Sequence, residues 1–206
     1  MYNIDFSDRF TYLKTYRFWN VLDSIKSMYQ KDSLDFFIIN RDKIIFQLSY
    51  SYGLRPLEII SLKRNDLNFD NKNDSNEAFG SIYVSSTKNN SFNNTNQSRL
   101  VYPIFKAVTE DIYKYLDLYD LMYLTHKNSS LFHSSKGNLF NLHYLNSRLQ
   151  YYNSKLDSNY RIESLYFFRQ YYIADLFRIE GIAQSFINLQ IGNNTTNNQI
   201  YNHLKP

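Results

Sequence analysis

Apolar residues recur at spacings of three and four along much of the chain, which is the period of an amphipathic helix. Between residues 16 and 29, for example, Phe18, Val21, Leu22 and Ile25 fall on one face. The period is interrupted at polar residues, glycine and proline, which mark the ends of elements. The pattern predicts helices over residues 16–29, 36–52, 104–116, 142–152, 165–179 and 182–189, a short helix beginning at Pro56, and a last short helix over 198–204.

Residues at the predicted helix ends fit these boundaries. Ser33 or Asp35 supplies a side-chain oxygen that can cap the helix over 36–52. Gly53 suits the left-handed position after that helix, and Gly181 stops a later one. Pro56 suits the first residue of a helix, where its missing N–H has no helical partner to lose. Arg55 is therefore expected at a helix start, where free backbone N–H groups favour an anion.

Two short segments rich in β-branched and aromatic residues, 81–85 and 99–102, predict strands. The polar connection between them, residues 87–98, predicts the tip of a hairpin. Residues 67–69 alternate like a third short strand, 131–132 are expected to be extended, and 134–138 form a turn. The order of helices, a small antiparallel sheet and further helices predicts an α+β fold that is mostly α, in a single domain over residues 1–206.

Composition narrows the class of protein without naming an activity. Hydrophobic residues make up 43% of the 206 residues, which is enough for a sizeable core. Cysteine is absent, so disulfides and thiolate metal sites are excluded. The four histidines are scattered without metal-like spacing, and we expect neither a metal nor a cofactor.

Charge and hydropathy agree with a nucleic-acid partner but do not require one. The formal net charge is +4 and the pI about 9.0, and an ordinary solvated surface explains both equally well. No apolar run approaches the ~18 residues that span a bilayer. The first residues carry neither the basic nor the apolar region of a signal peptide, so we expect a cytoplasmic protein, associated with the nucleoid if DNA is its partner.

The segment Gly53-Leu54-Arg55-Pro56-Leu57-Glu58-Ile59-Ile60-Ser61-Leu62 resembles the first active-site box of the tyrosine recombinases, the phage-integrase type. Five further landmarks follow in the family's order. Lys88 with residues 99–103 resembles the lysine-bearing hairpin, and residues 131–137 resemble the next landmark. Tyr166-Phe167-Phe168-Arg169 falls at the His-x-x-Arg box, Ile191-Gly192-Asn193 at Leu-Gly-His, and Gln199-Ile200-Tyr201 at the nucleophile.

The resemblance covers residues 16–204 and implies a site-specific DNA recombinase or integrase that works through a 3′-phosphotyrosyl intermediate. It makes Tyr201 the nucleophile and Lys88 the general acid. It also makes Arg55 and Arg169 the clamp on the phosphate oxygens, because guanidinium donors match phosphate and stay charged. Glu58 would brace one of these arginines.

Each of these residues also has a plainer interpretation. Tyr201 is one of 20 tyrosines, most of them packing residues, and Lys88 equally fits a solvated loop. Arg169 could pair with Glu163 or Asp175, and Glu58 could lie on a helix surface. Phosphate contacts by Lys63, Arg64, Arg99 and Lys136 would bind DNA, although each fits a solvated surface too.

Both family histidines are replaced, by Tyr166 and Asn193. These side chains donate neutral hydrogen bonds but supply no imidazolium, so we expect slower cleavage than in a pocket with histidine. Asn193 also fits a simple turn former. The helical domain with which most relatives clamp the far face of DNA is not expected here, and residues 1–15 would be a linker.

The expected partner is double-stranded DNA, with a monomer in solution assembling into a tetramer on it. Three alternatives stay open. The chain could be a DNA-binding relative that has lost catalysis, a nicking-closing enzyme like the type IB topoisomerases, or an unrelated α-rich binding module that matches the boxes by chance.

Overall fold

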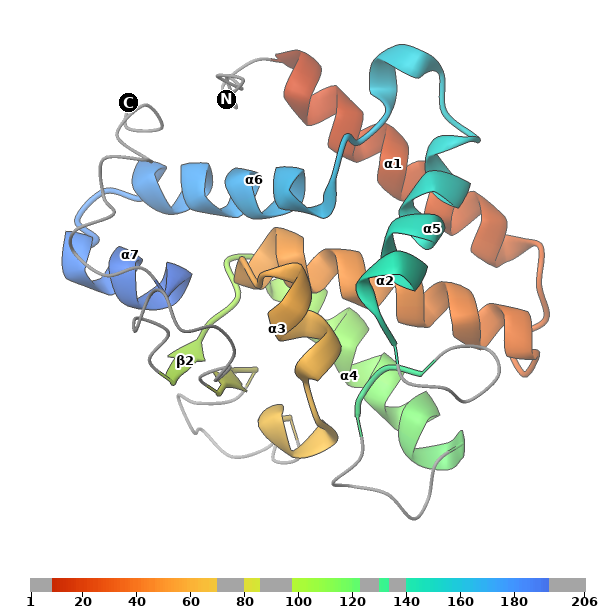
Figure 1. Ribbon diagram of the computed structural model, residues 1–206, viewed down its shortest axis with the longest axis horizontal. Coiled ribbons are helices and arrows are strands. Elements are labelled where there is room, and N and C mark those ends of the chain that lie inside the picture. The colour runs from red at the N-terminus through yellow and green to blue at the C-terminus, as the bar shows by residue number, and fades with distance from the viewer. Residues whose placement is uncertain (1–8, 70–79, 86–97, 123–129, 134–139, 193–206) are drawn as a thin grey trace.

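A computed structural model describes residues 9–69, 80–85, 98–122, 130–133 and 140–192, and statements about structure concern these ranges (Figure 1). The elements are α1 (Arg9–Ser27), α2 (Leu34–Tyr52), α3 (Pro56–Ser61), η1 (Arg64–Asp66), β1 (Ile82–Val84), β2 (Arg99–Val101), α4 (Lys106–Met122), α5 (Leu142–Asn153), η2 (Ser158–Tyr160), α6 (Leu165–Arg178) and α7 (Gln184–Ile191). The fold is α+β and mostly helical, as predicted.

Helix α2 is the centre of the molecule, and α1, α4 and α6 pack around it (Figure 1). Buried residues lie on every side of α2, as expected of a helix enclosed by others. One of its aromatic contacts is edge-on: the ring centroids of Phe18 and Phe46 are 5.2 Å apart and the ring planes are inclined by 81°. Phe168 of α6 packs on the same two rings. This aromatic centre joins α1, α2 and α6 into one core.

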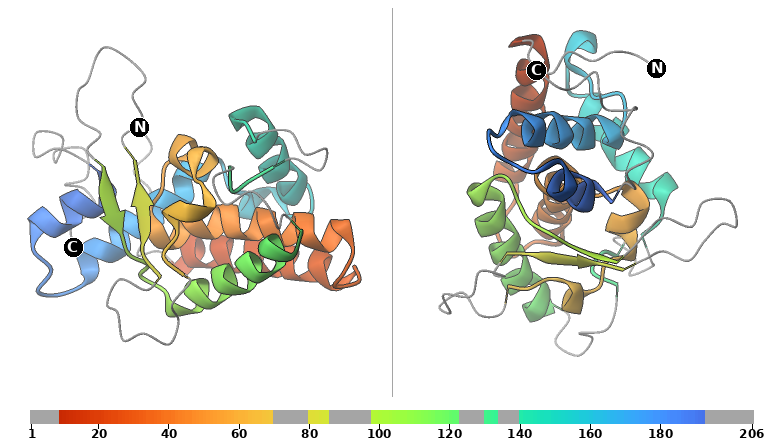
Figure 2. Two further views of the ribbon diagram at one scale, coloured as in Figure 1. Left: turned by 90° about the horizontal axis from the view of Figure 1, so that it is seen from below. Right: turned by 90° about the vertical axis from the view of Figure 1, so that its left-hand side faces the viewer.

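A second, smaller apolar cluster lies between α6 and α7. Tyr172, Ile173 and Leu176 face Ile187 and Ile191 there. The strands β1 and β2 pair antiparallel in the register Ile82 with Val101, and β2 contacts α7. Figure 2 shows α7 between α6 and this pair of strands. The end of α7 is therefore held from two sides.

The predicted boundaries are right at several ends. Ser33 caps α2 by accepting the N–H of Phe36, Gly53 takes a left-handed conformation with φ 62°, and Pro56 is the first residue of α3. Other boundaries differ. Helix α1 begins at Arg9, α4 runs to Met122, and α7 covers Gln184–Ile191.

Two differences have a physical cause in the contacts. Helix α4 starts at Lys106 because the N–H groups of Ile104 and Phe105 donate to the carbonyl and the hydroxyl of Ser51 at the end of α2. The strand predicted over residues 67–69 is reduced to a single β-bridge between Leu67 and Ile82. The turn predicted at 134–138 and the helix predicted at 198–204 lie outside the described residues.

A buried polar network ties α2 to α5. Asp42 accepts hydrogen bonds from Arg41 at 2.6 Å, from Arg148 at 2.5 Å and from the hydroxyl of Tyr152 at 2.9 Å. Arg41 also donates to the carbonyl of His133 at 2.6 Å. All these partners satisfy a carboxylate that burial would otherwise destabilise. No helix in the described ranges is long and apolar enough to span a membrane.

Gly53 gives a test of the packing between α2 and α6. A Cβ atom at Gly53 would lie 2.2 Å from Cδ1 of Tyr172 and would occupy the left-handed region as well. We expect Gly53→Ala to lower the free energy of unfolding in urea by about 3 kcal/mol or more, from strain and overpacking together.

Gly181→Ala is the matched control, since Gly181 has φ 80° and no atom within 4 Å of the added carbon. That variant should lose only about 1 kcal/mol. Equal losses would contradict the close packing of Tyr172 on Gly53.

Candidate active site

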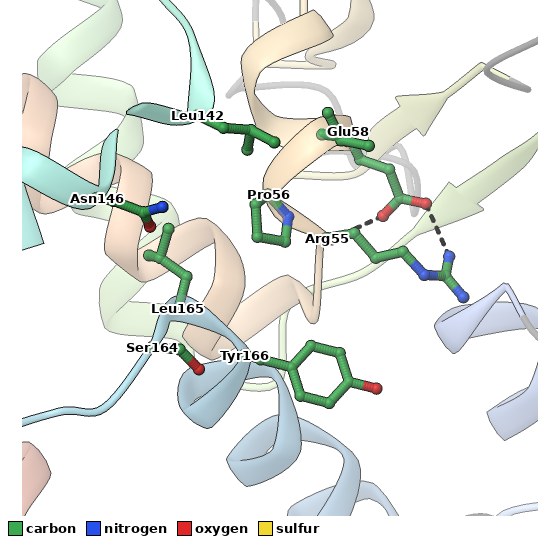
Figure 3. Close-up of a pocket in the computed structure, with 9 residues that line it drawn as sticks. Arg55, Pro56, Glu58, Leu142, Asn146, Ser164, Leu165 and Tyr166 are labelled. Atoms are coloured by element: carbon green, nitrogen blue, oxygen red, sulfur yellow. Dashed lines mark hydrogen bonds and ion pairs between the residues drawn. The ribbon is translucent and has the colours of Figure 1, made fainter. Parts of the chain in front are cut away.

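Arg55 directly precedes α3 and points its guanidinium group towards the end of α7. Its backbone is extended, with φ −72° and ψ 151°, as a residue before proline prefers. Glu58, three residues later, accepts the N–H of Arg55 through Oε2 at 2.8 Å and its Nη1 through Oε1 at 3.0 Å (Figure 3). The bond from the Arg55 N–H to the Glu58 carboxylate is one half of the capping box of a helix start, and the second bond is an ion pair across the same turn, so local geometry helps to fix both residues. The Arg55 side chain stays 27% exposed.

Glu58 is buried, with a side chain only 4% exposed, because a second arginine covers it. Arg99 of β2 binds it through two parallel hydrogen bonds, Nη1 to Oε1 at 2.9 Å and Nη2 to Oε2 at 3.0 Å. The interpretation of Glu58 as a surface carboxylate is therefore wrong. The prediction that Arg99 contacts DNA is wrong too, because its side chain is 2% exposed and its donors are engaged by Glu58.

The electrostatics of Glu58 follow from these contacts. Burial alone would raise the pKa of the Glu58 carboxyl group. Hydrogen bonds from Arg99, its charge, the charge of Arg55 and the Arg55 N–H outweigh burial and lower the pKa to about 2. Glu58 is thus ionised at any physiological pH.

Arg169 lies in mid-helix in α6 and is completely buried. It donates to the carbonyl of Gly53, at the junction of α2 and α3, and to the carbonyl of Ile191 at 2.6 Å. The two carboxylates considered from the sequence have other partners. Glu163 pairs with Lys14 and Asp175 with Arg178, whereas the contacts of Arg169 described above are with backbone carbonyls.

Three arginines from three elements meet at the carboxyl end of α7. Arg99 Nε donates to the carbonyl of Gln190 at 3.1 Å, Arg169 to that of Ile191, and Arg55 Nη2 to that of Gly192 at 3.2 Å. The last carbonyls of a helix lack helical partners and carry the negative end of its dipole, so cations are favoured there. We call Arg55, Arg99, Arg169 and Glu58, with these carbonyls, the arginine cluster. It fixes the point from which the chain continues to Asn193.

A cavity of about 430 Å³ lies beside Arg55 (Figure 3). Its walls come from α3, α5 and the start of α6, and Figure 3 shows the Tyr166 ring on the same side as the Arg55 side chain. Tyr166 is 38% exposed. The lining is mostly apolar, with Arg55 and Glu58 as its charged members: Arg55, Pro56, Leu57, Glu58, Leu142, Asn146, Ser164, Leu165 and Tyr166. A phosphate at Arg55 would therefore have an apolar surface next to it for its sugar.

The remaining predicted residues divide into three groups. Lys63 is exposed before η1, where a phosphate contact stays a prediction. Arg64 is buried and pairs with Asp120 at 3.0 Å, so its predicted role in DNA binding is wrong. Lys88, Lys136, Asn193 and Tyr201 lie outside the described residues.

The sequence did not point to the pairing of Arg99 with Glu58, because the two residues are 41 positions apart. One signal was present. Arg99 and Val101 share the buried face of β2, and an arginine on the inward face of a strand requires a partner. Gln190 was missed as well. Its side chain accepts the Tyr102 N–H at 2.9 Å and donates to the carbonyl of Leu100 at 3.2 Å, which fastens α7 to β2.

The low pKa of Glu58 makes the protein's stability depend on pH. A carboxyl group whose pKa falls from 4.5 to about 2 on folding stabilises the protein above pH 4.5, and this contribution is lost as the pH drops towards 2. We expect Glu58→Gln to lower the free energy of unfolding at pH 7 by roughly 3 kcal/mol. The difference from the wild type should shrink between pH 4.5 and 2. Urea unfolding across this range measures it, with the exposed Glu180→Gln as control; a difference independent of pH would contradict the ion pair.

No protein-family model matches the sequence, and no curated protein matches it. Solved structures do match. XerA recombinase aligns with 92% of this chain and 58% of its own, at 19% identity and a TM-score of 0.61. The integrase of the Tn1549 transposon, solved in complex with transposon right end DNA, aligns with 89% of this chain and 58% of its own, at 15% identity and a TM-score of 0.54. The chain thus spans less than two thirds of each matched structure.

Both matched proteins are tyrosine recombinases, and the alignments cover almost all of this chain. An α-rich module of an unrelated fold would not share this arrangement of helices and strands, so an unrelated fold is excluded. The fold predicted from the sequence is confirmed: the chain has the fold of the catalytic domain of the tyrosine recombinases.

Proposed function

We propose that this chain is a DNA strand transferase of the recombinase or integrase type, which cleaves and rejoins DNA through a 3′-phosphotyrosyl intermediate. One observation carries the proposal. Arg55 and Arg169 come from helices far apart in the sequence, and both donate to the end of α7. The fold in which they meet is that of recombinase catalytic domains.

The arginine cluster supports phosphate chemistry without a metal. Cleavage of a phosphodiester builds negative charge on the phosphate oxygens, and preorganised cations stabilise that charge. Arg55 is partly exposed beside the cavity, and Glu58 holds its guanidinium in one orientation. Arg169 is completely buried and donates to the carbonyls of Gly53 and Ile191. In the proposed complex, phosphate oxygens replace the carbonyl of Gly192 at Arg55 and one carbonyl at Arg169.

The nucleophile and the acid rest on the resemblance, because Tyr201 and Lys88 lie outside the described residues. The phenolic oxygen of Tyr201 attacks phosphorus and its proton passes to solvent, while the bond to the 5′ oxygen breaks. Lys88 protonates that oxygen and is reprotonated from solvent. A 5′ hydroxyl group of another strand then reverses the step, so no nucleotide cofactor is consumed.

Tyr166 and Asn193 take the positions of the family's histidines in this proposal. Tyr166 projects from α6 beside Arg55, and its phenol can donate a neutral hydrogen bond to a phosphate oxygen. Without an imidazolium the transition state gains less charge stabilisation, so the proposed enzyme is slow.

Double-stranded DNA is the proposed partner. One structure with this fold is an integrase bound to transposon DNA. On this chain, exposed Lys63 and also Lys136, which lies outside the described residues, would contact phosphates outside the cleavage site, and copies of the chain would assemble as a tetramer on DNA.

A second candidate function has one observation in its favour. Arg169 is completely buried against the carbonyls of Gly53 and Ile191, and both histidines are replaced. A protein that binds DNA and leaves the strand intact fits this closed arrangement as well.

A nicked suicide DNA substrate separates the two. We expect a covalent protein–DNA adduct in denaturing gels, its complete loss in Tyr201→Phe, and a decrease of about 10²-fold or more in its rate of formation in Arg55→Ala. Tyr16→Phe, at an exposed tyrosine on α1, is the matched control and should form the adduct at the wild-type rate.

Three outcomes would contradict the proposal. DNA binding without an adduct indicates the second candidate. An adduct that survives Tyr201→Phe rules out the proposed nucleophile. Relaxation of supercoiled DNA without dependence on sequence indicates a nicking-closing enzyme.

A further inference from the structure

Arg99 is an enclosed arginine that none of the family's sequence boxes assigns to catalysis. We infer that Arg99 is a positioning residue: it fixes the Glu58 carboxylate, and through that carboxylate it orients the Arg55 guanidinium group for phosphate. The link to phosphate rests on the proposed function, whereas the orientation of Arg55 is a property of the folded chain.

The hydrogen bonds at Glu58 show how this control works. Oε1 accepts from Nη1 of Arg55 at 3.0 Å and from Nη1 of Arg99 at 2.9 Å. Oε2 accepts from the N–H of Arg55 at 2.8 Å and from Nη2 of Arg99 at 3.0 Å. Each oxygen thus receives one donor from each arginine. Since the two oxygens offer about four acceptor positions, the carboxylate has no freedom to rotate away from Arg55.

Arg99 is itself held in place from the opposite side. Its Nε donates to the carbonyl of Gln190 at 3.1 Å, and its guanidinium group lies against Gly192. A Cβ atom at Gly192 would come within 2.6 Å of Nη1 and 2.7 Å of Cζ of Arg99. The side chain therefore fills the space between Glu58 and the end of α7. Because its donors are engaged by Glu58 and Gln190, it acts through these contacts.

The electrostatic surroundings of Glu58 make Arg99 necessary for its charge. Among the described residues, the charged groups that act on Glu58 are Arg55, directly before its own helix, and Arg99 from β2, while α5 brings the uncharged Leu142 and Asn146 to the same cavity. Without Arg99 the buried carboxylate keeps one cation. Its pKa then rises, and the protonated form, which has no negative charge, holds Arg55 more weakly.

A purely structural role is the alternative, since Arg99 also joins β2 to α7. The two roles differ in their dependence on pH. If Arg99 only stabilises the fold, folded molecules of a variant react normally at every pH. If Arg99 positions Arg55, folded molecules lose activity as the pH falls through the raised pKa of Glu58.

The experiment compares the wild type with Arg99→Met and Arg99→Lys by two measurements. Carbon-13 NMR of the side-chain carboxyl groups, assigned with Glu58→Gln, follows the titration of Glu58 in the absence of DNA. Single-turnover adduct formation on the nicked DNA gives the cleavage rate of the folded fraction between about pH 4 and 8. Arg148→Met is the matched control, because Arg148 also pairs with a buried carboxylate, that of Asp42, away from the cluster.

In Arg99→Met we expect the pKa of Glu58 to rise from about 2 to 4.5 or above. The cleavage rate should fall about 10²-fold and fall further towards low pH. Arg99→Lys keeps the charge but cannot bind both oxygens of Glu58 and the carbonyl of Gln190 together. Its cleavage rate should therefore lie between those of the wild type and Arg99→Met. If Arg99→Met does not fold, Arg99→Lys replaces it as the test. Arg148→Met should lower the stability of the protein but should not make the cleavage rate fall towards low pH.

An unchanged titration of Glu58 in the Arg99 variants would overturn the inference, whether or not the wild type cleaves DNA. A raised pKa with a cleavage rate that does not respond to pH would overturn it as well. If the wild type forms no adduct, the proposed function fails; the NMR titration then decides the orientation of Arg55 alone.

Discussion

The carbonyls at the end of α7, which have no helical partners, are the constraint on which the site depends. Three successive carbonyls, those of Gln190, Ile191 and Gly192, each accept a hydrogen bond from a different arginine. A helix end inside a protein needs such donors, and arginine supplies both donors and the positive charge that the dipole favours. The arginines arrive from β2, α6 and the start of α3, so satisfying one helix end brings three distant segments together. A structural requirement thereby gathers three guanidinium groups at one point, of which that of Arg55 is partly exposed beside the cavity.

Glu58 decides how that positive charge is distributed. It is the buried carboxylate that contacts both Arg55 and Arg99, and burial of an ion pair is tolerated only when all its donors and acceptors are matched. Arg99 contributes its charge to the interior, whereas Arg55 retains an exposed side next to the cavity. This division gives the site one accessible cation with a fixed orientation. The accessible groups of the site therefore depend on the Glu58 carboxylate. For this reason the fold alone, which is shared with recombinases at under 20% identity, does not establish catalysis.

The sequence was informative where the physics is local. The capping of α2 by Ser33, the left-handed Gly53, and the start of α3 at Pro56 depend on neighbouring residues, and the structure has all three. It failed where tertiary contacts decide. Arg64 and Arg99 were expected on the surface because arginine is usually exposed, but each is buried by a carboxylate distant in sequence. The start of α1 at Arg9 was missed because residues 9–15 lack a clear period. The roles of Lys88, Asn193 and Tyr201 stay predictions from the resemblance.

The central claim is that the arginine cluster binds the phosphate that is cleaved. The most direct measurement replaces this phosphate in a nicked DNA substrate by a methylphosphonate, which removes the charge, and compares cleavage by the wild type and by Arg55→Ala. On normal DNA the substitution should slow cleavage by about 10²-fold. On the methylphosphonate the penalty should largely disappear, because no charged oxygen is left for the guanidinium group to bind. The same penalty on both substrates would contradict a contact between Arg55 and the cleaved phosphate.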